Sequence, residues 1–258
     1  MPLRTTTIGA YPKPDGLDLP DWFRIGGPSG GNPTAAYTAY LKAAPPDLEA
    51  ALDRATREAV QDQVEAGIDV PSEGEIRRDN YIHYHCRHLQ GFDFETLVEK
   101  EMRTGAWTAK VPAVTGPIAP GAPFLVEDWR RAQAASERPV KITLPGPLTV
   151  ADTMADRHYG DERRLGAAVA EALEDAHRHN DLALLERFRG TTVILGAVAI
   201  AQTRVETREE IEARLSDALG HIEAERLMVA PDCGLGMLDR ATVGAKLRNM
   251  TSATAALA

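Results

Sequence analysis

Short runs of β-branched and apolar residues alternate along the chain with longer stretches of helical periodicity, and this alternation most constrains the fold. The first run is "LRTTTIG" at residues 3–9, and the last is "LMVA" at residues 227–230. Between them, apolar positions recur every three to four residues over 48–64 and over 161–188. Such alternation favours parallel βαβ units over an antiparallel meander. With 258 residues, the chain has the length of one (β/α)8 barrel, whose functional groups follow the carboxyl ends of the strands.

The number of strands is too small for a closed barrel. Six runs indicate core strands, near residues 3–8, 68–72, 113–118, 140–144, 191–200 and 227–230. Residues 96–114 indicate a hairpin, residues 124–135 a helix, and the Gly- and Pro-rich residues 13–45 a long loop. A βαβ unit takes about 30 residues, so the shortfall amounts to two units and falls within 165–175. We predict an α/β fold of the TIM-barrel family, incomplete, with residues 1–258 as one domain. An open six-stranded sheet is the alternative.

Charge and composition narrow the class of partner. The formal net charge of -9 disfavours nucleic acid and anionic membranes, because both attract basic surfaces. A small molecule is therefore the expected ligand. No run reaches the roughly 18 apolar residues of a membrane span, and the N-terminus lacks the layout of a secretory signal, so we expect a cytoplasmic protein. The two cysteines, Cys86 and Cys233, are too few for a disulfide framework.

Two strand ends carry residues suited to chemistry. Cys233 follows the last strand in "PDCG", where a thiolate beside a glycine suits a zinc ligand or a nucleophile. A buried, unreactive thiol is the alternative interpretation. Glu73 and Glu75 flank Gly74 after the second strand, a layout suited to an amino group, although a solvated charged turn explains it equally well.

Two histidine-rich segments are weaker candidates for a metal site. In "HYHCRHL" at residues 83–89, helical spacing places His83 and His85 on different faces, so we expect these rings to pack around a polar rim rather than to bind one metal ion. In "EDAHRHND" at residues 174–181, carboxylates and imidazoles offer donors that zinc accepts. A polar helix face is the alternative for this segment.

Six segments, taken in order, resemble the C-terminal catalytic barrel of cobalamin-independent methionine synthase and its single-barrel paralogues. They are "TTTIGAYP", "SEGEIRRDN", "LPGPLTV", "EDAHRHNDLALLERF", "VAPDCGLG" and "KLRNMTSA". The most specific is "PDCGL" followed by a helix that ends in "NM". The resemblance implies a (β/α) barrel and a zinc-dependent methyltransferase. It would move a methyl group from a donor such as a methylated folate to a thiol such as homocysteine, with zinc deprotonating the thiol.

The same resemblance assigns roles to individual residues. Cys233 and Glu174 match two zinc ligands, and Glu75 matches the acid that holds the amino group of homocysteine. The backbone of Ile8, Gly9 and Ala10 matches the stretch that receives the carboxylate of the amino acid. No residue is assigned as the acid or base of the reaction.

The chain departs from the family pattern in several places. Between Ala170 and Glu174 the family carries its fifth and sixth strands, with the His-x-Cys zinc ligands, and this chain lacks them. Ala201 stands near the position of the proton-donating histidine, which weakens the expectation of a folate donor. Two candidate zinc ligands are fewer than the three or four that zinc requires. The chain would therefore recruit His177, His179 or the "HYHC" histidines, bind zinc weakly, or bind no metal.

The departures leave three further alternatives open. One is alkyl transfer to another thiol, and another is a non-enzymatic remnant of the family. The third is a hydrolase or lyase that uses Glu73, Glu75 and the histidines without metal. Two strands missing from a barrel would expose sheet edges, so a homo-oligomer formed through those edges is a further expectation.

Overall fold

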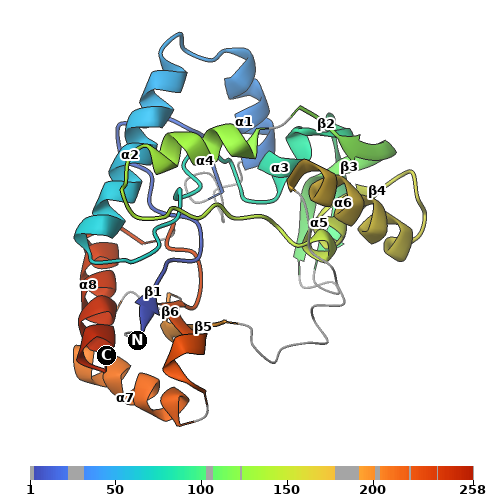
Figure 1. Ribbon diagram of the computed structural model, residues 1–258. Helices are drawn as coiled ribbons and strands as arrows, with labels where there is room; N and C mark the ends of the chain where they lie inside the picture. Colours follow the sequence, from blue (N-terminus) through green and yellow to red (C-terminus); the bar gives the residue numbers. More distant parts are fainter. Residues whose placement is uncertain are drawn as a thin grey trace.

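The protein is described from a computed structural model that covers residues 3–22, 32–102, 107–122, 124–177, 192–200, 204–220, 222–236 and 238–257. Helices and strands alternate along much of the chain (Figure 1). In chain order they are β1 (Arg4–Thr5), α1 (Pro33–Lys42), α2 (Leu48–Glu65), α3 (His83–Arg87), β2 (Leu89–Met102), β3 (Trp107–Pro120), α4 (Leu125–Gln133), α5 (Pro147–Thr153), β4 (Ala155–Asp156), α6 (Glu162–His177), β5 (Val193–Val198), α7 (Arg208–Leu219), the 3-10 helix η2 (Ala224–Arg226), β6 (Leu227–Pro231) and α8 (Arg240–Ala256).

One sheet contains the strands that the alternating pattern predicts. Its order is β1–β6–β5, and both pairs are parallel. Two isolated parallel bridges continue the order beyond β1, from Thr6 to Val70 and from Ser72 to Lys141. Five segments, from β5 across to the chain at Lys141, therefore run in the same direction. Their carboxyl ends meet at one edge, as the sequence pattern requires.

Helices α2, α7 and α8 cover this sheet and enclose the largest apolar core. The predicted helix that begins after Asp47 is α2, and its buried stripe includes Leu48, Leu52, Ala55 and Ala59. Its spacing of three to four residues is the amphipathic signature of a surface helix. Gly67 follows with φ of 89°, the left-handed conformation that ends many helices. The core then gathers side chains from the sheet and from α7 and α8, among them Val229, Ile211, Leu215, Val243 and Leu247.

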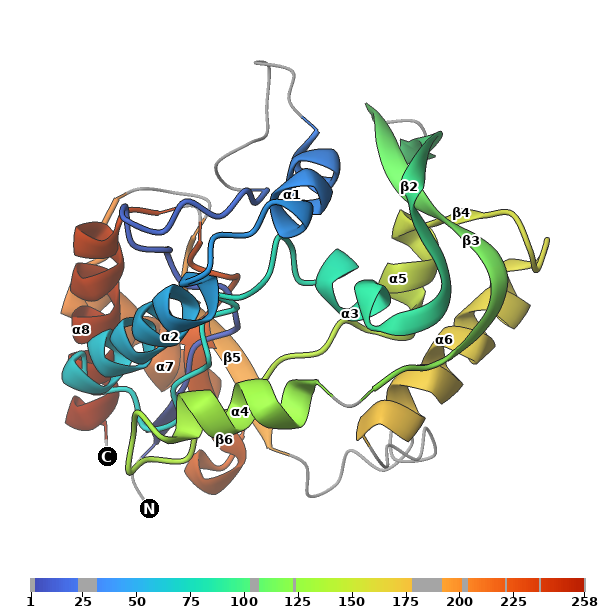
Figure 2. The same ribbon diagram turned by 90° about the horizontal axis from the view of Figure 1, so that it is seen from above.

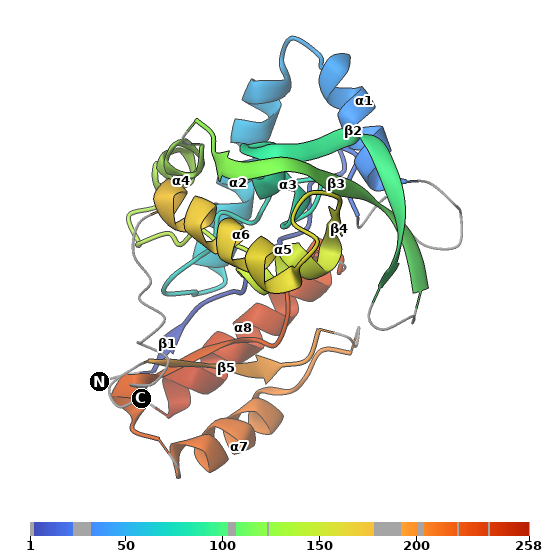
Figure 3. The same cartoon turned by 90° about the vertical axis from the view of Figure 1, so that its right-hand side faces the viewer.

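Residues 113–118 are not a core strand, which corrects one of the six predicted strands. They belong to β3, which pairs antiparallel with β2 and parallel with β4 in a second three-stranded sheet. The predicted hairpin over 96–114 is confirmed but is longer, because both of its strands extend for 14 residues. Helices α5 and α6 pack against this hairpin, away from β5 and β6 (Figures 2 and 3). A β-rich run has the same local pattern in either sheet, so the pattern alone could not assign it.

Two further expectations are corrected in part. The predicted loop over 13–45 contains α1, in which the side chain of Asn32 accepts from the backbone N–H of Ala35 and Pro33 occupies the first turn. The predicted strand over 140–144 makes one bridge, at Lys141, and α5 begins soon after it, at Pro147. The helix predicted over 161–188 is α6 as far as His177, and its remainder lies outside the described residues.

The described strands do not close a barrel. They form two separate sheets in a mixed α/β fold, with one sheet tracing an open series of parallel strands. The expectation of a single open six-stranded sheet is therefore wrong as well. Over the part of the chain covered by the structure, no helix combines the length and the apolar character needed to cross a membrane.

Candidate active site

The loops after β1 and after the Val70–Ser72 segment lie against each other. The Ser72 hydroxyl donates to the carbonyl of Gly9 (2.8 Å), and the Tyr11 N–H donates to the carbonyl of Gly74 (2.9 Å). A Cβ placed on Gly9 would lie 2.3 Å from Oε1 of Glu75. The backbone at Gly9 and the carboxylate of Glu75 are thus in direct contact, and the absent side chain at position 9 makes this contact possible.

Glu75 is held by both its backbone and its carboxylate. Its φ of 53° places a non-glycine residue in the left-handed region, directly after Gly74 with φ of 77°. Such a conformation costs about 1–3 kcal/mol and occurs most often at functional sites. The Thr143 hydroxyl donates to Oε1 of Glu75 (2.7 Å), and Nη1 of Arg78 lies 3.6 Å from the same oxygen. The structure therefore excludes the solvated charged turn that was the alternative interpretation of this segment.

Arg78 links Glu75 to a second buried carboxylate, Glu73. Its Nη2 donates to Oε1 of Glu73, and its Nη1 donates to the Thr143 hydroxyl (3.0 Å). Glu73 is 5% exposed, and burial raises its pKa to about 7, while the attraction of Arg78 opposes this change and the repulsion of Glu75 adds to it. Burial also lowers the pKa of Lys141, and the neighbouring Glu73 opposes that shift.

The loop after β6 brings Cys233 to the same edge of the sheet. The Leu235 N–H donates to the carbonyl of Ala10 (2.7 Å), and a Cβ on Gly234 would lie 3.3 Å from Cβ of Ala10. Cys233 is exposed, whereas Cys86 is buried in α3. The predicted residues Ile8, Gly9, Ala10, Glu75 and Cys233 therefore belong to three neighbouring loops. The exposure of Cys233 suits a reactive thiol.

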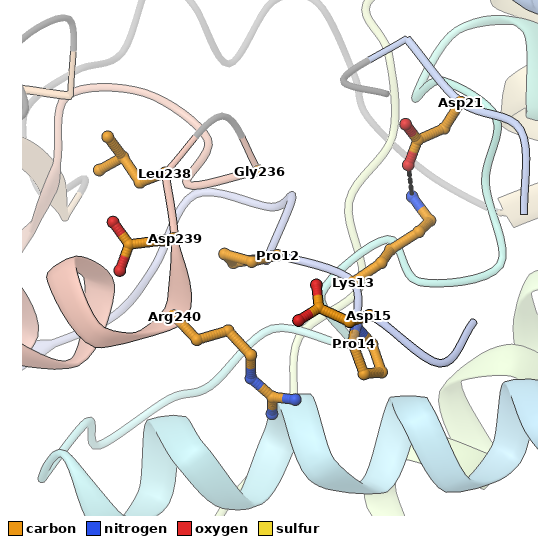
Figure 4. A pocket seen from close by; sticks show the side chains of 9 residues that line it. All are labelled: Pro12, Lys13, Pro14, Asp15, Asp21, Gly236, Leu238, Asp239 and Arg240. Carbon is orange, nitrogen blue, oxygen red and sulfur yellow. Dashed lines mark ion pairs between the residues drawn. The ribbon is translucent and has the colours of Figure 1, made fainter. Parts of the chain in front are cut away.

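A cleft of about 350 Å³ lies beside these loops (Figure 4). Its walls continue directly from the loops after β1 and β6 and contain Pro12, Lys13, Pro14, Asp15, Asp21, Gly236, Leu238, Asp239 and Arg240. Lys13 pairs with Asp21 at 2.7 Å (Figure 4), and both side chains are buried. Arg240 pairs with Asp62 and Glu58 of α2. Charged side chains make up much of the lining, and none of Ile8, Gly9, Ala10, Glu75 or Cys233 belongs to it.

The described side chains do not assemble a zinc site. Glu174 lies in α6, which packs against α5 and β3 rather than against β6, and its side chain and that of His177 lie outside those described. His179 and Ala201 also lie outside the described residues. Within the described part of the chain, no group of three or more His, Cys, Asp or Glu residues is placed to hold a metal ion. Because zinc needs three or four donors, Cys233 alone does not fit it.

The histidines of "HYHC" pack as aromatic side chains in α3, as expected. His83 makes edge contacts with Trp22 and Phe94, and its Nδ1 lies 3.0 Å from the hydroxyl of Thr34. Burial, aided by Arg87, lowers the pKa of His83 to about 3, so the ring is neutral at physiological pH.

Sequence reasoning missed the part played by Thr143 and Arg78. Thr143 lies just beyond Lys141, at the end of the next strand in the parallel order, and this position is the signal that could have indicated it. Arg78 lies in the segment "SEGEIRRDN", in which the sequence singles out only the two glutamates beside Gly74.

Comparisons with known proteins place the chain in a family. The family described as "Cobalamin-independent synthase, Catalytic domain" matches residues 33–183 and 163–256. These matches cover most of the chain, so the chain belongs to this family.

Relatives include methionine synthase of Sulfolobus acidocaldarius, 24% identical over an alignment of 326 residues that covers 98% of this chain and 91% of the relative. Methionine synthase of Sulfurisphaera tokodaii is 25% identical, with the same coverage. Among solved structures, a B12-independent methionine synthase from Shewanella sp. W3-18-1 in complex with selenomethionine superposes with a TM-score of 0.78. It is 24% identical, and the match covers 100% of this chain and 98% of that one. The likeness shows a shared fold.

Proposed function

We propose that this chain binds homocysteine at the loops after β1 and the Val70–Ser72 segment, and that it accepts a methyl group onto the thiol of that amino acid. The single observation that carries the proposal is the Glu75 carboxylate, which is held against Gly9 by Thr143 in a left-handed backbone conformation. A buried carboxylate at a fixed position favours an ammonium group, because hydrogen bonds to charged partners contribute about 1.5–3 kcal/mol.

Each of the expected residues has a distinct part in this proposal. Glu75 binds the ammonium group of the substrate, and the backbone of Ile8, Gly9 and Ala10 receives its carboxylate. The exposed thiol of Cys233, on the adjoining loop, lies at the end of the sheet where the substrate thiol would arrive. The relatives named methionine synthase support this choice of substrate and reaction. In that reaction a carbon–sulfur bond forms as the bond between the methyl group and its donor breaks, and a methylated folate is the expected donor.

Zinc enters the proposal through the resemblance alone, which matches Cys233 and Glu174 to two of its ligands. No step is assigned to the metal, since the described side chains supply only one of these donors. The test is alkylation of Cys233 with iodoacetamide in the presence and absence of zinc, together with metal analysis of the purified protein. Zinc that slows the alkylation and is lost in Cys233→Ala supports the site. An alkylation rate unchanged by zinc excludes Cys233 as a ligand.

Calorimetric titration with L-methionine, the expected product, tests amino-acid binding. Wild-type protein should bind it, and Glu75→Gln should raise the Kd by about 10-fold to 100-fold, because a neutral amide loses the charge that pairs with the ammonium group. Glu65→Gln is the matched control, since Glu65 is an exposed glutamate at the end of α2. Failure of the wild-type protein to bind methionine, or equal binding by Glu75→Gln, would contradict the proposal.

Activity separates the enzyme from the alternatives. Methyl transfer to homocysteine is measured directly with a methylated folate, and alkyl transfer is measured with other thiols in its place. A chain that binds methionine and transfers no alkyl group to any thiol would be a remnant that retains the amino-acid site. We also propose self-association through β5, which pairs with β6 and exposes Ile194 on the sheet, and light scattering of the purified protein tests it.

A further inference from the structure

Two carboxylates compete for one guanidinium group beneath the proposed amino-acid site. Arg78 is 2% exposed and donates to Glu73 through Nη2, while its Nη1 lies 3.6 Å from Oε1 of Glu75. That second distance is within the range of an ion pair but beyond that of a hydrogen bond. Arg78 is thus hydrogen-bonded to Glu73, whereas its ion pair with Glu75 is the longer of the two.

We propose that Glu73 is a positioning residue that keeps Arg78 away from Glu75, and so leaves the Glu75 carboxylate available to the ammonium group of the substrate. This inference rests on the proposed function, because it assigns Glu75 to the amine. Glu73 itself does not touch the substrate in this scheme. If Glu73 were neutral, the guanidinium would keep its bond to Thr143 and would turn its charge to Glu75, in competition with the incoming amine.

The surroundings of Glu73 support this role. Its Oε2 has no hydrogen-bond partner among the described residues and is buried. Together with Thr56, Arg77 and Asp128, Glu73 lines a space of about 10 Å³, which is enough for one water molecule. Nε of Arg77 lies 3.8 Å from Oδ1 of Asp128 across the same region. Burying a carboxylate is costly unless it is paired or hydrogen-bonded, and Arg78 is the cation that pairs with Glu73.

The balance of charges around Glu73 makes the arrangement dependent on pH. The groups that face it are Arg78, Lys141, Glu75 and Asp128, with Arg77 at the far wall of the space. Because the pKa of Glu73 is raised to about 7, the carboxylate changes from mostly protonated at pH 6 to mostly ionised at pH 8. Its hold on Arg78, and with it the affinity for the amine, should therefore increase from pH 6 to pH 8.

The test compares two ligands that differ only in the amino group, L-methionine and 4-(methylthio)butanoate, by calorimetric titration of the full chain. Glu73→Gln should raise the Kd for methionine about 10-fold, equivalent to about 1.4 kcal/mol, and should change the Kd for 4-(methylthio)butanoate less than twofold. Glu73→Asp, which keeps the charge, should restore part of the methionine affinity. Methionine affinity of the wild-type protein should rise between pH 6 and pH 8, while that of Glu73→Gln stays level.

Each contrary outcome has a distinct meaning. Equal weakening of both ligands would show a merely structural role and overturn the inference, and so would unchanged methionine binding by Glu73→Gln. Absence of methionine binding by wild-type protein would instead contradict the proposed function. A crystal structure of Glu73→Gln tests directly whether the guanidinium group of Arg78 moves from position 73 to Glu75. The distance from Arg78 to Glu75 should fall from 3.6 Å into hydrogen-bond range, and an unchanged distance overturns the inference.

Discussion

Gly9 and Glu75 are in contact across two loops that lie 66 residues apart in the sequence, so closely that a Cβ on Gly9 would lie 2.3 Å from Oε1 of Glu75. The Cγ2 atom of Thr143 would lie 3.3 Å from the same Cβ. The positions of the carboxylate and of its hydroxyl donor therefore both depend on the absence of a side chain at position 9.

This contact predicts the effect of Gly9→Ala. The methyl group should displace the Glu75 carboxylate from Thr143 and raise the Kd for methionine at least about 10-fold. Stability should fall by only about 1 kcal/mol, because the displaced atom is the end of a flexible side chain. Calorimetric titration and urea unfolding measure the two effects. Gly16→Ala is the control, since nothing lies within 4 Å of a Cβ at that position. Normal methionine binding by Gly9→Ala would contradict the assignment of Glu75 to the proposed amino-acid site.

The two cysteines should differ sharply in reactivity. Cys233 is exposed at the end of the sheet, whereas Cys86 is buried and its burial raises the pKa of the thiol, which leaves it protonated. Iodoacetamide should therefore label one thiol per native chain and two in urea, as counted by intact mass. Cys233→Ser should remove the native label, and Cys86→Ser should keep it. Native labelling at Cys86 would show that α3 opens readily.

The order of the parallel strands explains why much of the candidate site could be predicted from the sequence. Gly9, Glu75 and Cys233 each follow a strand, and the carboxyl ends of parallel strands share one edge, so local pattern and topology suffice to bring them together. Residues 113–118 could not be assigned in this way, because β-branched residues favour a hairpin and a core strand equally. The Gly- and Pro-rich bias of residues 13–45 likewise concealed α1.

Arg78 marks the limit of prediction within the site. Its neighbours in sequence indicate a charged loop, and nothing local distinguishes an exposed arginine from a buried one. Its role follows from Thr143, which lies 65 residues further along the chain, and from the depth at which Glu73 is buried. Such pairings depend on distances in the folded chain rather than on spacing in the sequence. The ligand set proposed for zinc shares this difficulty, because spacing in the sequence does not bring Glu174 and Cys233 together.

The raised pKa of Glu73 predicts how stability depends on pH. In the unfolded chain a glutamate titrates near 4.3, whereas burial raises the pKa of Glu73 to about 7 in the folded protein. Between these values the folded state binds more protons, so this group makes the free energy of unfolding decrease as pH rises, by at most about 1.4 kcal/mol per pH unit. Glu73→Gln lacks the effect.

Urea unfolding of the wild type and of Glu73→Gln at pH 5, 6, 7 and 8 measures the contribution of Glu73 to the free energy of unfolding. The free energy of unfolding of Glu73→Gln minus that of the wild type should increase from pH 5 to pH 7 and then level off towards pH 8, because only the wild type loses stability as Glu73 ionises. The difference cancels the titration of other residues, including the neutral His83. A constant difference, or one that decreases with pH, would show that Glu73 is already ionised at pH 5.

Lys246 provides a prediction about stability that is independent of the candidate site. It is fully buried in α8, and its Nζ donates to Oε2 of Glu206 (2.7 Å) and to the carbonyl of Ala199 (3.0 Å). The Ala199 N–H donates in turn to Oε1 of Glu206 (2.8 Å). The ion pair of Lys246 and Glu206 therefore connects the chain after β5 to α8. Lys246→Met leaves a buried carboxylate without its cation and should lower the free energy of unfolding by about 3–5 kcal/mol.

Two comparisons in urea unfolding separate the buried charge from the loss of the side chain. The double variant Lys246→Met with Glu206→Gln should recover part of the stability, because no isolated charge remains in the interior. Lys42→Met should cost less than about 1 kcal/mol, since Lys42 and Glu95 form an exposed pair at 2.6 Å. If the double variant is no more stable than Lys246→Met alone, the cost comes from lost hydrogen bonds to backbone carbonyls, and the ion pair contributes little to holding α8 against the sheet.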